Sequence, residues 1–283
     1  MGDTDEVKRL QEFALRIRMG IVEEIQARGF GHLGGSLSIA DALAVLYGEE
    51  MRVQPDNPQW EERDMLVCSK GHAGPAVYAA LALKGFFPYD WLVSLNQPGT
   101  RLPSHCDAQK TPGVDMTTGS LGQGASLAAG LALGKLLKRT PGRVFLILGD
   151  GELNEGQVWE TFQFASAKAL SSLVVLIDKN NKQLDGYTRD VLDTGSILDK
   201  MRAFGFESEE IHGNSVEELR RALSRTRDRK GMPSAIVLHT VKGKGIREAE
   251  ETMANHSMNV SYEKCQEWLL LLQHELEMLR REV

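Results

Sequence analysis

The amino-acid sequence predicts a doubly wound α/β domain, with a mostly parallel sheet and helices on both of its faces. Two short, almost fully apolar runs stand at residues 144–148 and 173–177, and a helical pattern of apolar residues joins them. This order is typical of a βαβ unit whose strands are buried on both faces. A further buried run at residues 234–239 adds another strand. We therefore expect residues 1–283 to form a single domain of this class.

The composition is that of an ordinary globular protein, and it argues against several classes of partner. Of the 283 residues, 42% are hydrophobic and 25% are charged, and the formal net charge is -6 without any basic block, so we expect no nucleic-acid partner. No apolar stretch is long enough to cross a bilayer, and the acidic N-terminus lacks the plan of a signal peptide. Three cysteines, Cys68, Cys106 and Cys265, predict free thiols in the cytoplasm.

The N-terminal part predicts two helices around a glycine-rich loop. Apolar residues recur at helical spacing from Val7 to Ile25. The loop that follows, residues 29–36, is dense in glycine and contains one histidine, His32. Ser38 is then expected to cap a second, short helix.

The next segments again place glycine and histidine together. A short strand at residues 63–67 leads into Gly71-His72 at the start of a helix, which is a natural site for a diphosphate. His105 stands in a later loop, and a glycine-rich loop at residues 117–124 precedes another helix. Small residues at such a helix start allow a ligand to approach the backbone, although tight packing alone would select the same residues.

Polar residues end both strands of the central βαβ unit. The first strand stops at Gly149-Asp150-Gly151, and the second stops at a run that contains Asn180. Because the carboxyl ends of parallel strands meet at one edge of a sheet, Asp150 and Asn180 should lie together there. One carboxylate and one amide oxygen suit a hard cation such as Mg²⁺, which usually keeps phosphate oxygens in its shell. Gly149, Gly151 and the helix start expected after them suit a phosphate. The polar residues at either strand end, taken alone, would indicate only a turn.

The C-terminal third continues the alternation of helices and strands. A helix is predicted at residues 197–203, a strand at residues 206–211, and a further helix behind an N-cap at Ser215. A basic, glycine-rich loop at residues 240–245 follows the last strand. The final amphipathic helix, at about residues 262–281, is expected to pack on the domain or on a partner.

The central stretch resembles a known cofactor motif. Gly149-Asp150-Gly151, followed further along by Asn180, is similar to the thiamine diphosphate-binding motif. The stretch resembles the transketolase family in particular through further matches at Glu152-Leu153, Glu155-Gly156, Trp159-Glu160 and Asp185-Gly186. The resemblance covers nearly the whole chain and implies the diphosphate-binding domain of that fold.

This resemblance implies a metal site and a set of residues around thiamine diphosphate. The metal, Mg²⁺ or else Ca²⁺ or Mn²⁺, would be held by Asp150, Asn180 and the backbone carbonyl of Lys182. The residues implied for the cofactor are His72, Gly119, Leu121, Gly149, Asp150, Gly151, Glu152, Asn180 and His256. The residues implied for catalysis are His32, His72, His105 and Glu155. The sequence departs from the family pattern on both sides of His105 and in the segment before His256.

The activity that the resemblance implies is transfer of a two-carbon ketol unit from a ketose, usually phosphorylated, to an aldose. The cofactor would carry the chemistry, while the protein positions it and stabilises charge. The pyrimidine-binding and C-terminal domains of the family have no counterpart in these residues. We therefore expect the N-terminal subunit of a split transketolase, whose partner subunit carries the pyrimidine-binding domain, with two copies of each chain in a heterotetramer.

Two alternatives to this activity stay open. One is another thiamine diphosphate enzyme, such as a synthase that resembles deoxyxylulose-phosphate synthase. The other is a non-catalytic subunit that keeps the fold. The presence of Asp150, Asn180, His32 and His72 argues against this second alternative.

Overall fold

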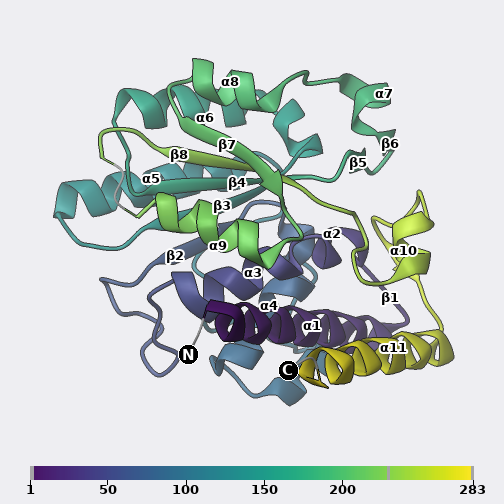
Figure 1. Cartoon of the computed structure of the whole chain (residues 1–283). Coiled ribbons are helices and arrows are strands. Elements are labelled where there is room, and N and C mark those ends of the chain that lie inside the picture. The colour runs from purple at the N-terminus through teal and green to yellow at the C-terminus, as the bar shows by residue number, and fades with distance from the viewer. Residues whose placement is uncertain (1–2, 228–229, 282–283) are drawn as a thin grey trace.

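The central feature is a five-stranded, wholly parallel sheet, seen in a computed structural model that describes residues 3–227 and 230–281 (Figure 1). In spatial order the strands are β2 (Met65–Cys68), β3 (Val144–Gly149), β4 (Leu173–Lys179), β8 (Ser234–His239) and β7 (Glu207–His212). The predicted βαβ unit is confirmed, because β3 and β4 are neighbours and helix α6 (Gly156–Ala167) connects them. All five strands end at the same edge of the sheet, so their loops converge there.

The two faces of the sheet bury separate hydrophobic cores, since alternate side chains of a strand point to opposite faces. On one face, Phe145 and Ile147 of β3 belong to the larger core. The helices that contribute to this core include α1 (Asp3–Arg28), α3 (Ala40–Val45), α4 (Gly74–Lys84) and α9 (Val216–Arg225). On the other face, Leu146 and Leu148 pack with α5 (Gln123–Lys138), α6 and α8 (Ile197–Ala203). Figure 1 shows α6 and α8 above the sheet and α1, α3 and α4 below it, so helices cover both faces and the doubly wound prediction is confirmed.

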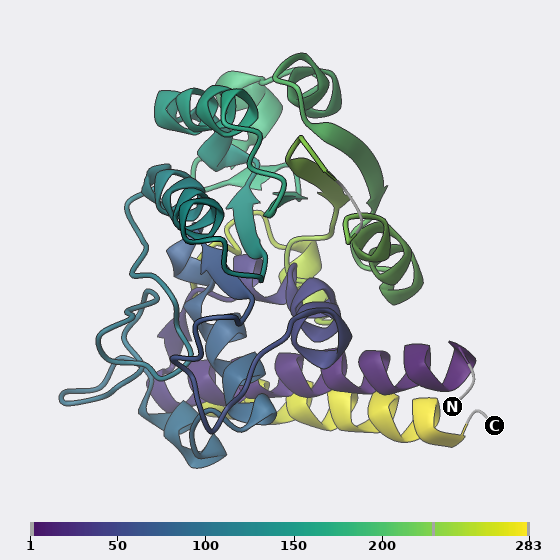
Figure 2. The same cartoon turned by 90° about the vertical axis from the view of Figure 1, so that its left-hand side faces the viewer.

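The last helix, α11 (Tyr262–Arg281), lies alongside α1 at the end of the molecule remote from α8 (Figure 2). Its buried residues are Cys265, Trp268, Leu272 and Leu276, which join the larger core. The sequence allowed this helix to pack on the domain or on a partner. The structure shows that its apolar face packs on the domain. Within residues 3–227 and 230–281, no helix combines the length and the apolar character that a membrane span requires.

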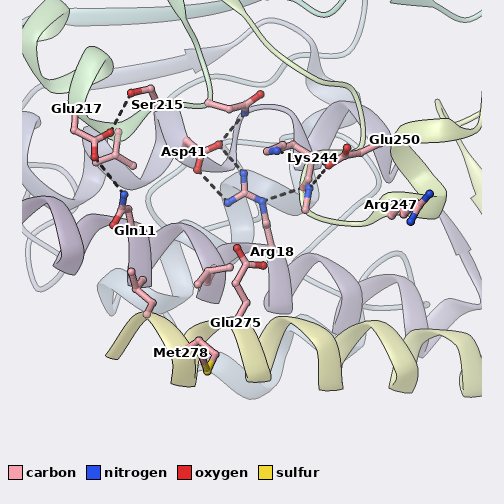
Figure 3. Close-up of a pocket in the computed structure, with 15 residues that line it drawn as sticks. Gln11, Arg18, Asp41, Ser215, Glu217, Lys244, Arg247, Glu250, Glu275 and Met278 are labelled. Atoms are coloured by element: carbon pink, nitrogen blue, oxygen red, sulfur yellow. Dashed lines mark hydrogen bonds and ion pairs between the residues drawn. The ribbon is translucent and has the colours of Figure 1, made fainter. Parts of the chain in front are cut away.

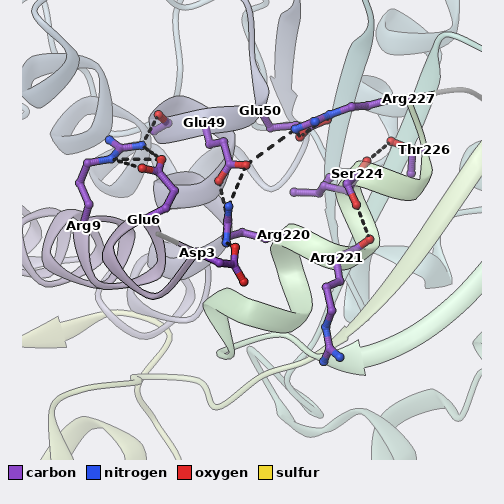
Figure 4. A network of polar contacts seen from close by, with 12 residues as sticks. Asp3, Glu6, Arg9, Glu49, Glu50, Arg220, Arg221, Ser224, Thr226 and Arg227 are labelled. Atoms are coloured by element: carbon purple, nitrogen blue, oxygen red, sulfur yellow. Dashed lines mark hydrogen bonds and ion pairs between the residues drawn. The ribbon is translucent and has the colours of Figure 1, made fainter. Parts of the chain in front are cut away.

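A network of charged residues fixes the opposite, amino edge of the sheet. Figure 4 shows Glu49 and Glu50, at the end of a π-helical turn η1 (Leu46–Glu50), reaching arginines of α9 and of the segment that follows it. Arg227 and Arg143 both contact the buried Glu50 carboxylate, with Arg143 Nη1 at 2.6 Å from Glu50 Oε1. Since Arg143 directly precedes β3, these ion pairs join α9 and η1 to the start of a central strand. The network therefore contributes to stability at the edge that carries no ligand loops.

Short elements complete the structure and shape the loops at the carboxyl edge. Two small antiparallel ribbons pair β1 (Phe30–Gly31) with β9 (Met258–Asn259) and β5 (Lys182–Gln183) with β6 (Gly186–Tyr187). The short helical elements are α2 (Gly34–Leu37), η2 (Gly71–Ala73), η3 (Tyr89–Ser94), η4 (Gly151–Asn154), α7 (Thr188–Leu192) and α10 (Arg247–Glu251).

Two local predictions are wrong. Ser38 is not the N-cap of α3, which is Ile39; it is the C-cap of α2, and its hydroxyl donates to Asp178 Oδ2 at 2.7 Å. The α-helix expected directly after Gly151 begins only at Gly156, because the four residues of the 3₁₀ turn η4 intervene. The acceptor of Ser38 lies far along the chain, so the local sequence does not reveal this contact.

Candidate active site

A cavity of about 440 Å³ opens at the carboxyl edge of the sheet, where β2, β3, β4 and β8 end. All of the predicted site residues line it, namely His32, His72, His105, Gly119, Leu121, Gly149, Asp150, Gly151, Glu152, Glu155, Asn180, Lys182 and His256. Glu160, part of the family match at Trp159-Glu160, is exposed on α6 and is not among the lining residues. The topology thus brings together residues that lie far apart in the sequence.

Four histidines form one cluster in this cavity, and we call His32, His72, His105 and His256 the histidine cluster. The ring of His32 lies 5.7 Å from that of His72, 5.3 Å from that of His105 and 5.4 Å from that of His256, measured between centroids. His72 and His256 are closer still, at 4.5 Å. The ribbon of β1 and β9 explains why residues so distant in sequence meet, because it pairs Gly31 with Met258.

The environment of the histidine cluster favours neutral imidazoles. Burial lowers the pKa of His32 and of His105, and in His32 the neighbouring His105 adds to the effect. Burial, Lys70 and the other rings lower the pKa of His72 strongly. Burial and then Lys242 lower the pKa of His256 to about 4. Near neutral pH each ring can therefore accept a proton from a bound hydroxyl on one nitrogen and donate from the other.

The carboxyl ends of β3 and β4 present oxygen atoms to the same cavity. Asp150 is only 4% exposed, and its two oxygens accept from the amides of Gly151 at 2.9 Å and Asn181 at 2.6 Å. Burial, followed by the charge of Asp178, raises the pKa of Asp150 to about 6, and a bound cation would relieve both effects. Within residues 3–227 and 230–281 no group of three His, Cys, Asp or Glu side chains is arranged to hold a metal ion.

The donor set at this point nevertheless fits a hard cation. It consists of one carboxylate, the amide oxygen of Asn180 and the carbonyl of Lys182, all of them oxygen atoms. Mg²⁺ is commonly held by one or two carboxylates and completes its shell with phosphate oxygens and water. The residues present therefore fit a Mg²⁺–diphosphate pair better than a metal enclosed by protein alone.

Glu152 holds the loops of the cavity together. Its Oε1 accepts from the Ser69 hydroxyl after β2 and from the amide of Gly122 at 2.8 Å, and its Oε2 accepts from the amide of Gly149 at 3.2 Å. Burial raises its pKa, and these donors offset part of that effect. The side chain thus joins three segments around the cavity, and its predicted contact with a cofactor stays a prediction.

Two buried lysines line the cavity and were not selected from the sequence. Lys70 is 1% exposed, and its ammonium group donates to the Gly35 carbonyl at 2.7 Å and to Asp178. Lys242 is 3% exposed and donates to the Lys182 carbonyl at 3.1 Å, and burial lowers its pKa to about 8. Both follow strand ends, in the Gly-His segment and in the basic loop, which is the signal that could have identified them. They bring positive charge to a cavity suited to an anion.

A larger cavity, of about 750 Å³, lies between α1, α11 and the loops around Asn214 and Lys244 (Figure 3). Its floor is the buried ion pair of Arg18 and Asp41, in which Arg18 Nη2 lies 2.6 Å from Asp41 Oδ2. Arg18 also donates to the Lys244 carbonyl at 3.0 Å, and Asn214 donates to Asp41 at 2.8 Å. These groups satisfy one another and carry both signs of charge. The cavity at the carboxyl edge is therefore the better candidate for the active site.

Comparison with known proteins points to one family. The family model described as "Transketolase, thiamine diphosphate binding domain" matches residues 10–268. The chain is 49% identical over 254 residues to the 6-deoxy-6-sulfo-D-fructose transketolase subunit of Clostridium sp. (strain MSTE9), covering 90% of this chain and 92% of that one. It is 31% identical to an apulose-4-phosphate transketolase subunit of Phocaeicola vulgatus, covering 98% of each. Among solved structures, the transketolase from Leishmania mexicana superimposes with a TM-score of 0.85 at 29% identity, covering 98% of this chain but only 45% of its own.

Proposed function

Since the chain belongs to the transketolase family, as its thiamine diphosphate-binding domain, we propose that it takes part in transferring a two-carbon ketol unit from a ketose to an aldose. The observation that carries the proposal is the single cavity at the carboxyl edge of the sheet. That cavity joins the histidine cluster to oxygen donors and to two buried lysines. The comparisons name transketolases and their subunits, so a related synthase activity is not favoured.

The diphosphate end of the cofactor would lie against Gly149, Gly151 and Lys242, with Mg²⁺ held by Asp150, Asn180 and the Lys182 carbonyl. The oxygen donors and the raised pKa of Asp150 support this placement. When bound, thiamine diphosphate supplies the electron sink that cleavage of a carbon–carbon bond next to a carbonyl requires. A cation and buried ammonium groups balance the charge of the diphosphate.

The histidine cluster would handle the protons of the sugar hydroxyls. Neutral imidazoles in a partly buried site can accept a proton from one hydroxyl and return it to an oxygen of the product. Positioning of the sugar against several rings at once contributes to orientation as well as to proton transfer. Glu155 is exposed at the mouth of the cavity, which supports a role near a second chain rather than at the reacting atoms.

A partner subunit would close the cavity. The chain spans 45% of the solved transketolase that it matches, whereas the curated relatives named as subunits have nearly its own length. Helix α5 also exposes Leu127, Gly130 and Leu137 at helical spacing, and a Cβ added at Gly130 would meet no atom within 4 Å. We therefore infer a second chain with the pyrimidine-binding domain, in a heterotetramer with two copies of each.

The three free, buried cysteines support a reducing, cytoplasmic location.

The donor sugar is inferred to be a ketose with a terminal anionic group. The 49% identical relative is named for 6-deoxy-6-sulfo-D-fructose, and the relative from Phocaeicola vulgatus is named for a sugar phosphate. Turnover of 6-deoxy-6-sulfo-D-fructose and of fructose 6-phosphate should be compared in the assembled enzyme. A higher kcat/KM for 6-deoxy-6-sulfo-D-fructose would support a sulfonated donor, as in the name of the first relative. If neither sugar is turned over, the inference that the donor is an anionic hexulose is wrong.

The metal assignment can be tested by changing Asp150→Ala. Because this removes the only carboxylate of the donor set, Mg²⁺-dependent binding of thiamine diphosphate should be lost in calorimetry, with the fold retained by circular dichroism. The matched control is Asp190→Ala, which removes an exposed carboxylate from α7. Unchanged affinity in the Asp150 variant would show that the cation lies elsewhere.

Partner dependence is tested by assaying the purified chain alone and then with the candidate second subunit. The isolated chain should be inactive, because one wall of the cavity would be open to water. Addition of the second chain should restore ketol transfer. Full activity of the chain by itself would refute the split arrangement.

A further inference from the structure

The carboxylate of Asp178 lies buried directly behind the proposed metal site. Asp178 is 0% exposed and stands in β4, two positions before Asn180. Its Oδ2 accepts from Ser38 Oγ at 2.7 Å, from Asn180 Nδ2 at 2.9 Å and from the Lys70 ammonium group. Its Oδ1 accepts from the Thr240 hydroxyl. One carboxylate therefore joins four segments of the chain at the carboxyl edge.

The amide of Asn180 is held by two hydrogen bonds, and it donates in one and accepts in the other. Its nitrogen donates to Asp178, and its oxygen accepts from the backbone N–H of Lys182 at 3.1 Å. Rotation of this amide by half a turn would place its oxygen against the Asp178 carboxylate and its NH₂ group against the Lys182 N–H. Both contacts would then be repulsive, since two acceptors or two donors would face each other. Only the observed orientation satisfies both contacts, and it leaves the amide oxygen on the side of Lys182.

From this arrangement we propose that Asp178 is a positioning residue, which fixes the Asn180 amide with its oxygen toward the cation. The inference rests on the proposed metal site and adds to it a residue that contacts one of the proposed ligands. Residues that orient the ligands of a metal typically change its affinity by about 10–100-fold when they are replaced. Asp178 would act through Asn180, without touching the cation itself.

The ion pair with Lys70 makes this role possible. The Lys70 ammonium group can only donate, and it contacts Oδ2, the same oxygen that accepts from Asn180 Nδ2. An acceptor is therefore required at this point, and it fixes the nitrogen of the Asn180 amide. Lys70 also donates to the Gly35 carbonyl and to Ser38 Oγ, so its ammonium protons are engaged within this network.

The decisive comparison removes Asp178 in two backgrounds. In Asp178→Ala the Asn180 nitrogen loses its acceptor, so the amide can rotate and offer NH₂ to the cation. In the Asn180→Asp background the side chain at position 180 ends in two equivalent oxygens and needs no orientation, so Asp178→Ala is made there as well. Binding of Mn²⁺ to the full chain, with thiamine diphosphate in excess, is measured by the electron paramagnetic resonance of free Mn²⁺.

Asp178→Ala should weaken Mn²⁺ binding by about 10–100-fold in the chain that keeps Asn180, and by no more than about threefold in the Asn180→Asp background. A purely structural role for Asp178 would weaken binding equally in both backgrounds. Unchanged affinity in Asp178→Ala, or an equal loss in both backgrounds, would overturn the proposal. Should Asp178→Ala not fold because Lys70 loses its carboxylate, the same comparison is made with Lys70→Met in all four proteins.

Thr240→Val is the matched control, because it removes a donor to the other oxygen of Asp178 and leaves the contact with Asn180. It should lower the melting temperature while Mn²⁺ affinity stays within about threefold.

Mn²⁺ binding to the unchanged chain distinguishes a failure of this inference from a failure of the proposed function. If it binds no Mn²⁺ with the cofactor, the metal site itself is wrong. If it binds Mn²⁺ and Asp178→Ala binds it equally well, only the positioning role fails.

Discussion

Replacing Glu24 with methionine should stabilise the protein and remove a pH dependence of its folding. Glu24 lies in α1, is 0% exposed, and neither of its carboxylate oxygens has a hydrogen-bond partner within the described residues. Burial, and then the charge of Glu23, raises its pKa well above the ordinary value of 4.5. The folded protein therefore holds Glu24 neutral, whereas the unfolded chain ionises it near its ordinary pKa.

The sign and size of the effect follow from proton linkage. Above about pH 4.5 the folded state binds one more proton at Glu24 than the unfolded state does, so this carboxyl favours unfolding as the pH rises. Between that pH and the raised pKa, the free energy of unfolding should fall by about 1.4 kcal/mol per pH unit through this group. Glu24→Met keeps the length of the side chain and removes the unsatisfied oxygens, a gain of about 1–3 kcal/mol near pH 7.

The assay is thermal and urea unfolding of the unchanged chain and of Glu24→Met at several pH values from 5 to 8. A gain of this size corresponds to a rise in melting temperature of roughly 2–6 °C. The difference between the two proteins should widen as the pH rises. Glu267→Met, on the exposed face of α11, is the control and should change stability by no more than about 0.5 kcal/mol. A difference that does not vary with pH, or a variant less stable than the unchanged chain, would refute a neutral, unpartnered Glu24.

Three further outcomes are expected. Changing any one member of the histidine cluster to alanine should lower turnover of the assembled enzyme by about 10²–10⁴-fold in steady-state assays, whereas His274→Ala, exposed on α11, should leave it unchanged. Asp41→Ala should destabilise the fold by about 3–5 kcal/mol in urea titrations, because it leaves the Arg18 guanidinium buried without its carboxylate. Gly130→Leu should block association with the partner subunit in size-exclusion chromatography without lowering the melting temperature, since Gly130 is exposed and an added Cβ meets no described atom within 4 Å.

The sequence predicts most of the candidate site because many of its residues stand at strand ends or in glycine-rich loops. In a parallel sheet, Asp150 after β3 and Asn180 after β4 must lie at the same edge, whatever the conformation of the loops. His105 and His256 follow only from the resemblance to a family pattern. The structure corrects the start of the helix after Gly151 and the assignment of Ser38 as an N-cap, and it places short elements inside the expected loop at residues 29–36.

The rest could not be predicted, because it depends on which side chains meet across the structure. Lys70 and Lys242 are ordinary charged residues in sequence, and their burial becomes visible only when the loops after β2 and β8 face each other. The burial of Glu24 could not be predicted either, because α1 also carries charged residues on its exposed face. A periodic pattern identifies the buried stripe of a helix, but it does not show that an acidic residue belongs to that stripe without a partner.

The ribbon of β1 and β9 also bears on when the site can exist during synthesis of the chain. The five strands of the main sheet are complete once His239 has been made, yet His256 and the strand that pairs with Phe30 have still to follow. Closure of so long a loop is entropically costly and is repaid only by contacts formed late. A nascent chain can thus hold a finished sheet while the histidine cluster is still incomplete, until the residues up to Asn259 have left the ribosome.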